Sequence, residues 1–227
     1  MIEVKNVTKT YGKKTNPFVA LRDASFSIPK GASVAILGKS GSGKSTLMHA
    51  MSGLDKPEKG QIIIDGHDIL LMSQKDIDEF RSEKMGFIFQ SFFVQANESC
   101  YDNVSLPLEI AKMSPLRRKV RIEAALKAVD LIDKKKSLAW ELSGGQKQRL
   151  AVARAIASSP QILFADEPTG NLDSVTGKII ENLLFRYNKK FKVTLIIVTH
   201  DKDLAARCDI QINIKDGVID SVIGSKK

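Results

Sequence analysis

The sequence predicts an α/β fold: a largely parallel sheet with helices between its strands, an N-terminal antiparallel β part and an inserted helical lobe. Three observations lead to this prediction. Short apolar runs alternate with amphipathic helical stretches, residues 1–31 contain broken β segments, and residues 91–160 carry helical patterns without a convincing strand. The 227 residues, 43% of them hydrophobic and 27% charged, supply one compact core. We therefore expect a single domain over residues 1–227.

The first segments are predicted to be β structure because short apolar runs are interrupted by glycine and proline. The apolar positions are Ile2, Val4, Val7, Phe26 and Ile28, and the breaks are Gly12, Pro17 and Pro29. Residues 32–37 then form a buried strand, which runs through a glycine-rich loop into a helix over residues 44–51. Further strands are predicted at 61–64, 87–89, 162–165, 195–198 and 210–214.

The lobe at about 91–160 is predicted to be helical, with helices over residues 115–129 and 145–158. Farther along, apolar residues recur at helical spacing and predict a helix with one apolar face, which we interpret as core packing. These residues are Ile179, Ile180, Leu183, Leu184 and Tyr187.

The charge balance leaves several partners open. Lys and Arg total 35 against 26 Asp and Glu, a formal net charge of +9, which suits nucleic acid, anionic lipid or a solvated surface. The charge clusters contain few aromatic residues for base stacking, which favours a solvated surface and no specific nucleic acid. These clusters are Arg117 to Lys119, Lys134 to Lys136, Lys189 with Lys190, and Lys226 with Lys227.

The sequence shows no recognisable targeting signal, and we therefore expect the chain to stay in the cytoplasm. The start of the chain carries no apolar stretch of signal-peptide length, and the chain has no apolar run long enough to span a bilayer. Any membrane role is therefore expected to act through a partner. The two cysteines, Cys100 and Cys208, fit this compartment and indicate neither a disulfide framework nor a metal site.

A phosphate-binding loop is predicted directly after the strand at 32–37. The segment fits G-x-x-x-x-G-K-[ST], with a strand before it and a helix after it. Its residues are Gly38, Lys39, Ser40, Gly41, Ser42, Gly43, Lys44 and Ser45, followed by Thr46. Glycines let backbone N–H groups turn toward phosphate oxygens, Lys44 reaches the β- and γ-phosphates, and Ser45 can ligate Mg²⁺.

Two carboxylates follow the apolar strand at 162–165. Asp166 is expected to hold Mg²⁺ through water, and Glu167 is expected to accept a proton from the attacking water. Taken alone, acids at a strand end could also cap the next helix, but the phosphate loop makes the catalytic interpretation the stronger one.

The segment Leu142-Ser143-Gly144-Gly145-Gln146 exposes backbone donors at the start of the helix over 145–158. Alone it could be a helix cap. Together with the preceding motifs, the sequence resembles an ATP-binding-cassette (ABC) ATPase subunit, whose signature motif is Leu-Ser-Gly-Gly-Gln. The resemblance extends over the whole chain and implies a P-loop NTPase core with an inserted helical lobe.

The resemblance implies further roles for single residues. Tyr11 resembles the aromatic residue that stacks on adenine, Gln90 the Q-loop glutamine, Asp173 the D-loop aspartate and His200 the switch histidine. The family's catalytic positions then match Lys44, Gln90, Glu167 and His200, and Mg²⁺ would be held by Ser45, Gln90 and Asp166. Across a head-to-tail dimer, the nucleotide would also meet Ser143, Gly144, Gly145, Gln146 and Asp173.

The resemblance also implies partners: a second cassette, with a homodimer as the simpler arrangement, and a separate integral membrane permease on the inner face of the cell membrane. Residues 166–174, with Thr-Gly at 176–177, are similar to the lipoprotein-releasing and macrolide-export group, which works by mechanotransmission. Two alternatives remain open at this point. One is a soluble cassette ATPase acting on ribosomes or nucleic acid, and the other is a cell-division cassette that transports nothing.

Two segments depart from the family pattern. Residues 93–101 are more polar than the family's apolar, proline-containing stretch, which faces the permease. The difference suggests an unusual partner surface, and neutral drift at an exposed loop stays open as the alternative. The single tryptophan, Trp140, stands just before the signature where a proline is common, and we expect it to be a packing anchor.

Overall fold

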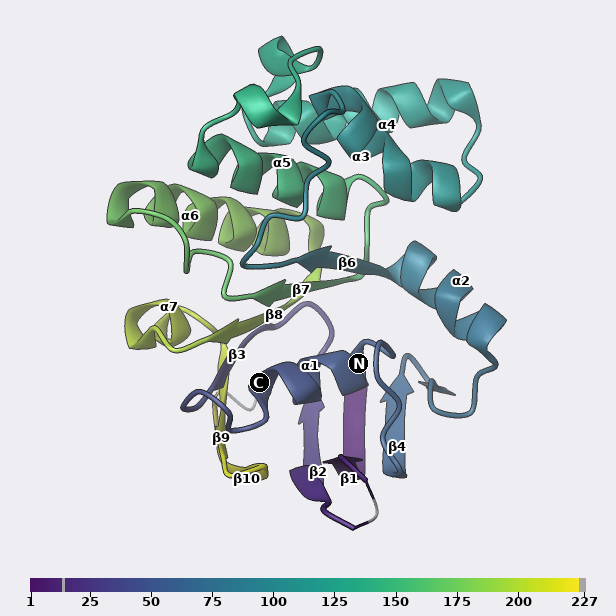
Figure 1. The fold of residues 1–227 in the computed structure, drawn as a ribbon, viewed down its shortest axis with the longest axis vertical. Coiled ribbons are helices and arrows are strands. Elements are labelled where there is room, and N and C mark those ends of the chain that lie inside the picture. Colours follow the sequence, from purple (N-terminus) through teal and green to yellow (C-terminus); the bar gives the residue numbers. More distant parts are fainter. Residues whose placement is uncertain (14, 225–227) are drawn as a thin grey trace.

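Two β-sheets and a group of helices make up the chain, as the computed structural model in Figure 1 shows for residues 1–13 and 15–224. The predicted α/β class, the N-terminal antiparallel part and the largely parallel main sheet are confirmed. The terminal pair Lys226 and Lys227 lies outside the described residues.

The smaller sheet is antiparallel, in the order β2-β1-β4-β5. Its strands are β1 (Ile2–Tyr11), β2 (Phe18–Ile28), β4 (Lys59–Ile64) and β5 (His67–Asp68). Ile2, Val4 and Val7 are buried while Lys5 and Asn6 are exposed, so one face of this sheet enters the core.

The larger sheet has the order β10-β9-β3-β8-β7-β6 and is parallel except at the β9-β10 hairpin. Its strands are β3 (Ser33–Leu37), β6 (Met85–Ile88), β7 (Ile162–Asp166), β8 (Thr194–Thr199), β9 (Ile210–Lys215) and β10 (Val218–Gly224). Every residue of β8 is buried, as expected for a strand covered on both faces. The carboxyl ends of β3, β6, β7 and β8 meet at one edge, where ligands of open α/β sheets bind.

The helices are α1 (Lys44–Met51), α2 (Gln74–Lys84), α3 (Cys100–Ile110), α4 (Pro115–Ala128), α5 (Gly144–Ile156), α6 (Ser174–Phe191) and α7 (Lys202–Ala206). In Figure 1 the helices α3, α4 and α5 lie together above the large sheet, on the side away from the small sheet.

Alternate residues of the central strands supply two separate cores. In β7, Ile162 and Phe164 join a core that includes both sheets and α1, whereas Leu163 and Ala165 join a core formed with α3, α5 and α6.

The prediction for Trp140 was wrong. Its side chain is 58% exposed on the short 3₁₀ turn Ala139–Glu141, and it is the neighbour, Ala139, that is fully buried. A single turn can present only part of its circumference to the core, and the small residue occupies that part.

Among the described residues, no helix is both long and apolar enough to cross a bilayer.

Candidate active site

The loop after β3, residues 38–43, forms a cradle that requires glycine at two positions. A Cβ atom on Gly38 would lie 2.4 Å from the carbonyl oxygen of Ile214 and 2.4 Å from Ser42 Oγ. Gly43 has a φ of +102° and immediately precedes α1, which receives no side-chain cap. The first N–H groups of α1 are therefore left to a ligand, and they favour an anion. The Ser42 hydroxyl is buried and has no partner among the described residues, a further group that a ligand could satisfy.

A positive charge stands at the same helix end. Lys44 Nζ donates to the carbonyl oxygen of Lys39 at 2.9 Å, which holds the ammonium group over the loop. The cradle, the positive end of the α1 dipole and the ammonium group of Lys44 together fit the phosphate chain of a nucleotide.

Asp166 ends β7 and faces this loop. Burial raises the pKa of its carboxyl, and a hydrogen bond with the Ser45 side chain acts in the opposite direction. A carboxylate beside a serine hydroxyl is an oxygen donor set that suits Mg²⁺, which usually takes its remaining ligands from water and phosphate. The residues present therefore fit a magnesium ion.

Glu167 adopts a left-handed backbone with φ of +45°, and its N–H donates to the carbonyl oxygen of Val198 at 2.9 Å. This conformation, uncommon for a residue with a side chain, breaks the strand at Asp166. Glu167 Oε1 lies 2.9 Å from Nδ1 of His200, which follows β8 and has a side chain 75% exposed.

Gln90 follows β6 and is paired with a loop residue beyond Glu167. Asn171 donates through Nδ2 to the carbonyl oxygen of Gln90 at 3.0 Å, and the Gln90 amide lies 3.4 Å from Asn171 Oδ1. The two loops are thus tied together at the edge of the sheet.

These groups line one cleft of about 540 Å³. Of the sequence-predicted residues, the cleft brings together Ser40, Gly41, Gly43, Lys44, Ser45, Thr46, Gln90, Asp166, Glu167 and His200. Four other predicted residues do not line it. Gly38, Lys39 and Ser42 belong to the same loop, and the Tyr11 hydroxyl donates to Asp55 Oδ2 at 2.5 Å.

The predicted cross-dimer residues lie apart from the cleft. Ser143 caps α5 in a reciprocal box, since its Oγ accepts from Gln146 N at 3.3 Å and its own N–H donates to Gln146 Oε1 at 3.0 Å. Asp173 caps α6 through Thr176 N at 3.0 Å. A Cβ on Gly145 would lie 2.4 Å from Thr176 Cγ2, so the beginnings of α5 and α6 touch, and both cap residues lie at that junction.

Three residues that the structure places at the site could not be recognised from the sequence. Phe18, which is 60% exposed, and Ala20 line the cleft from β2, and they occupy ordinary strand positions. Gln148 on α5 is completely buried and donates to the carbonyl oxygen of Pro168, the residue after Glu167, at 2.5 Å. Its place after the signature motif gave no indication of this contact.

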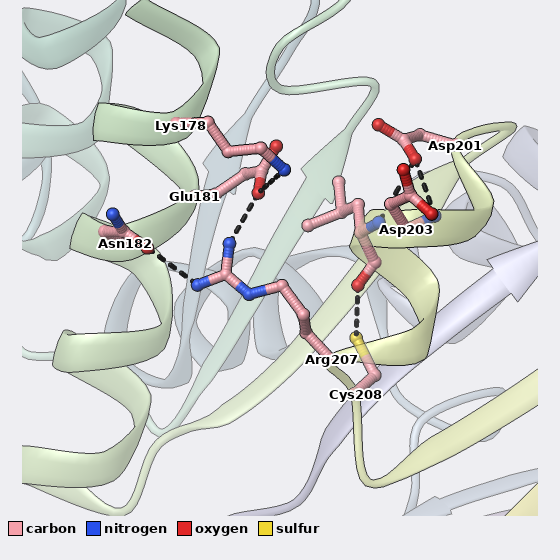
Figure 2. Close-up of polar contacts among 8 residues, drawn as sticks. Lys178, Glu181, Asn182, Asp201, Asp203, Arg207 and Cys208 are labelled. Carbon is pink, nitrogen blue, oxygen red and sulfur yellow. Dashed lines mark hydrogen bonds and ion pairs between the residues drawn. The ribbon is translucent and has the colours of Figure 1, made fainter. Parts of the chain in front are cut away.

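An ion-pair cluster holds the segment that follows His200 (Figure 2). Asp201 caps α7 by accepting from Asp203 N and Leu204 N, and Arg207 then reaches back to α6, where it pairs with the buried Glu181 at 2.5 Å. Helix α6, which Asp173 caps, and the segment that follows His200 are therefore fixed to each other.

Comparison with known proteins points to one family. The family described as ABC transporter matches residues 21–170. The chain is 41% identical over 219 residues to the lipoprotein-releasing system ATP-binding protein LolD of Syntrophus aciditrophicus, covering 96% of this chain and 98% of that protein. It is 40% identical over 223 residues to the ABC transporter ATP-binding protein YtrE of Bacillus subtilis, covering 96% of each chain.

A solved structure extends the agreement to the fold. The dimeric structure of MJ0796, a bacterial ABC transporter cassette, superimposes with a TM-score of 0.91 at 38% identity over the full length of both chains. A second structure of MJ0796, a dimeric post-hydrolysis state bound to ADP and Pi, superimposes with a TM-score of 0.90 at 37% identity, also over the full length of both chains.

Proposed function

The chain belongs to the ABC transporter family as an ATP-binding cassette that hydrolyses ATP for a membrane transporter, and from this premise we propose that two copies form a head-to-tail ATPase for one separate permease. Each of the two ATP sites would be completed by the other copy. Through the permease, the pair would sit on the inner face of the cell membrane.

One observation carries this proposal. Residues from four strand ends of one chain line a single cleft, yet Ser143 and Asp173 lie outside it, with their side chains at the junction of α5 and α6. A second copy that presents this junction to the cleft would add donors to the exposed side of the phosphates. The dimer described for MJ0796 makes the same arrangement reasonable here.

The residues of the cleft suggest how the reaction proceeds. The loop N–H groups and Lys44 would hold the phosphate chain and offset its negative charge. Glu167 would accept the proton of the attacking water, and His200, hydrogen-bonded to Glu167, would contact the γ-phosphate. Ser45, Asp166 and Gln90 would hold Mg²⁺, which would supply further charge neutralisation.

A second hollow offers a surface for the permease. A groove of about 570 Å³ lies between α2, β6, α3 and α5, beside the loop that follows Gln90. It is lined mostly by apolar groups, with Arg81, Arg154 and Asp78 among its polar residues. A cytoplasmic segment of the permease that entered this groove would touch Arg154, which donates to the carbonyl oxygens of Phe92 and Phe93 in the loop that follows Gln90.

For the branch of the family, we propose the lipoprotein-releasing and macrolide-export group, in which the cassette drives mechanotransmission. The motif over 166–177 and the full-length similarity to LolD support this assignment. The polar stretch over 93–101 is ordered by the buried Asn103, whose Nδ2 donates to the carbonyl oxygens of Gln95 and Ser99 at 3.0 Å. A defined shape of this kind suits a specific permease contact.

The decisive experiment uses the Glu167→Gln variant, which keeps the volume of the side chain but loses the base. We expect it to bind ATP, to form a stable dimer in size-exclusion chromatography with ATP and not with ADP, and to hydrolyse ATP at least about 100-fold more slowly than the unchanged chain. A variant that stays monomeric with ATP would overturn the composite site, and one that hydrolyses ATP at the full rate would remove Glu167 from the role of base.

The branch is tested by capturing the tagged variant with ATP from solubilised cells of its source. Recovery of a permease with a large extracytoplasmic domain would support mechanotransmission. Recovery of ribosomes or nucleic acid that resists high salt, without any membrane protein, would overturn the coupling to a permease.

A further inference from the structure

Gln148 connects three parts of the site through one side chain. It lies in the second turn of α5, the helix that Ser143 caps, and it is completely buried. Its Nε2 group donates to the carbonyl oxygen of Pro168 at 2.5 Å and lies 3.5 Å from the carbonyl oxygen of Phe89. These two carbonyls belong to the residues that adjoin Glu167 and Gln90 in the chain.

The loops that Gln148 holds are packed closely against each other. A Cβ on Gly170 would lie 2.9 Å from Gln90 Nε2, and Asn171 is hydrogen-bonded to Gln90 on the same side. A small displacement of either loop would therefore move the other. Gln148 is the side chain that fixes both loops to the helix carrying the signature motif.

The chemistry of the contact favours positioning over simple packing. The Gln148 amide oxygen is buried and has no hydrogen-bond partner in the described part of the chain, an arrangement that is unfavourable for folding. The amide nitrogen offers directional hydrogen bonds to two backbone carbonyls, which an apolar side chain of the same size would lack. Apolar contacts let neighbouring segments slide, whereas hydrogen bonds to the backbone fix their register.

We propose that Gln148 is a positioning residue that transmits the orientation of the signature helix to Glu167 and Gln90 together. The proposal rests on the composite ATP site. When Ser143 of one copy engages the nucleotide of the other, α5 takes a defined orientation, and Gln148 carries it to the catalytic loops of its own chain. Loss of Gln148 should therefore slow hydrolysis more than it weakens nucleotide binding. The reason is that the groups that hold the phosphates lie on a separate loop, the one after β3.

The test compares Gln148→Met with a matched control. Met nearly keeps the volume and removes both amide N–H donors. Asn188→Leu makes an equivalent change far from the cleft, because Asn188 is 5% exposed and its Nδ2 donates to the carbonyl oxygens of Val193 and Gly31 at 2.6 and 3.0 Å. Steady-state ATPase kinetics are measured for both variants below their melting temperatures, with melting curves recorded alongside.

We expect Gln148→Met to lower kcat by about 10- to 100-fold, the usual cost of a catalytic group displaced by a fraction of an ångström to one ångström. We expect its KM to stay within about twofold of the unchanged value and ATP-driven dimerisation to persist when Gln148→Met is combined with Glu167→Gln. Asn188→Leu should melt at a similarly lowered temperature while it keeps its kcat.

Equal losses of kcat in the two variants would overturn the proposal, because a general loss of stability would then explain both. A loss of dimerisation, or a rise in KM without a fall in kcat, would overturn it as well. If Gln148→Met does not fold, Gln148→Leu, which also lacks the amide N–H donors, replaces it and should show the same selective loss of kcat. Failure of both to fold would make Gln148 a structural residue. The proposed function is judged separately. It stands, whatever the Gln148 variants do, as long as the unchanged chain hydrolyses ATP and the Glu167→Gln variant does not.

Discussion

Nδ1 of His200 lies 2.9 Å from Oε1 of Glu167, so the histidine that follows β8 and the carboxylate that follows β7 form one hydrogen-bonded pair. A carboxylate can only accept a hydrogen bond, so His200 donates to Glu167 through Nδ1–H. With a side chain 75% exposed, His200 is free to change partners, whereas Glu167 is held by its backbone bond to Val198.

The first prediction concerns this pair. His200→Gln should lower kcat by about 100-fold while nucleotide affinity changes little, since the phosphate chain is held mainly by the loop after β3. ATPase kinetics and the binding of a fluorescent nucleotide measure the two effects separately. His67→Gln, at the exposed start of β5, serves as the control and should behave like the unchanged chain. Parallel losses of affinity and kcat in His200→Gln would contradict this division of roles.

The second prediction tests the cradle. Gly38→Ala would bring its Cβ within 2.4 Å of the carbonyl oxygen of Ile214, a backbone atom that cannot turn away. We expect a loss of about 2 kcal/mol or more in the free energy of unfolding and a loss of ATP binding. Gly66→Ala is the matched control, because Gly66 has a φ of +86° with open space around it and should cost only about 1 kcal/mol. Denaturant titration and nucleotide binding distinguish the two, and unchanged ATP binding in Gly38→Ala would count against the cradle.

The third prediction follows from the raised pKa of Asp166. Burial favours the protonated carboxyl in the folded chain, so this group stabilises the fold below the ordinary value of 3.8, and that stabilisation is lost as the pH rises through the folded pKa. Asp166→Asn should therefore unfold at a higher denaturant concentration than the unchanged chain at neutral pH, by about 1 kcal/mol, and should have lost its ATPase activity. The difference in stability should shrink as the pH falls toward 4. A variant less stable than the unchanged chain at neutral pH would refute the burial argument.

How far the sequence determined the site depends on the distance between residues in the chain. Lys44 and Ser45 could be placed because a strand, a glycine loop and a helix follow one another directly, and Asp166 and Glu167 because they end an apolar run. The parallel sheet then brings these ends to one edge whatever the intervening residues are. The pairing of Asn171 with Gln90 depends on tertiary packing, which no local pattern records.

Some elements were missed for local reasons. Helix α3 contains Pro107 and carries the polar residues Asp102 and Asn103 near its start, so its sequence has no clear helical stripe. The helix nevertheless forms because Ser99 caps it and because Val104 and Leu108 are fully buried against α4 and α5. The place of Phe18 in the cleft could not be predicted from the sequence either. A strand residue becomes part of a cleft only when a loop distant in sequence folds against it.

The last prediction concerns Glu181, which is 3% exposed and lies between two cations, Lys178 and Arg207, as Figure 2 shows. Arg207 makes the shorter contact at 2.5 Å, and it also donates to Asn182 Oδ1 at 2.7 Å and lies over the Phe185 ring at 4.5 Å. Arg207→Met would leave a buried carboxylate without its main partner, so we expect a loss of about 3 kcal/mol in the free energy of unfolding.

Two comparisons separate the charge effect from lost packing. Lys178→Met removes the other cation, whose side chain is 57% exposed, and should cost no more than about 0.5 kcal/mol because solvent screens that pair. The double variant Glu181→Gln with Arg207→Met should recover most of the loss, since no buried charge then remains unpaired. If the double variant stays as unstable as Arg207→Met, the contacts of Arg207 with Asn182 and Phe185 hold α7 against α6, and the ion pair contributes little.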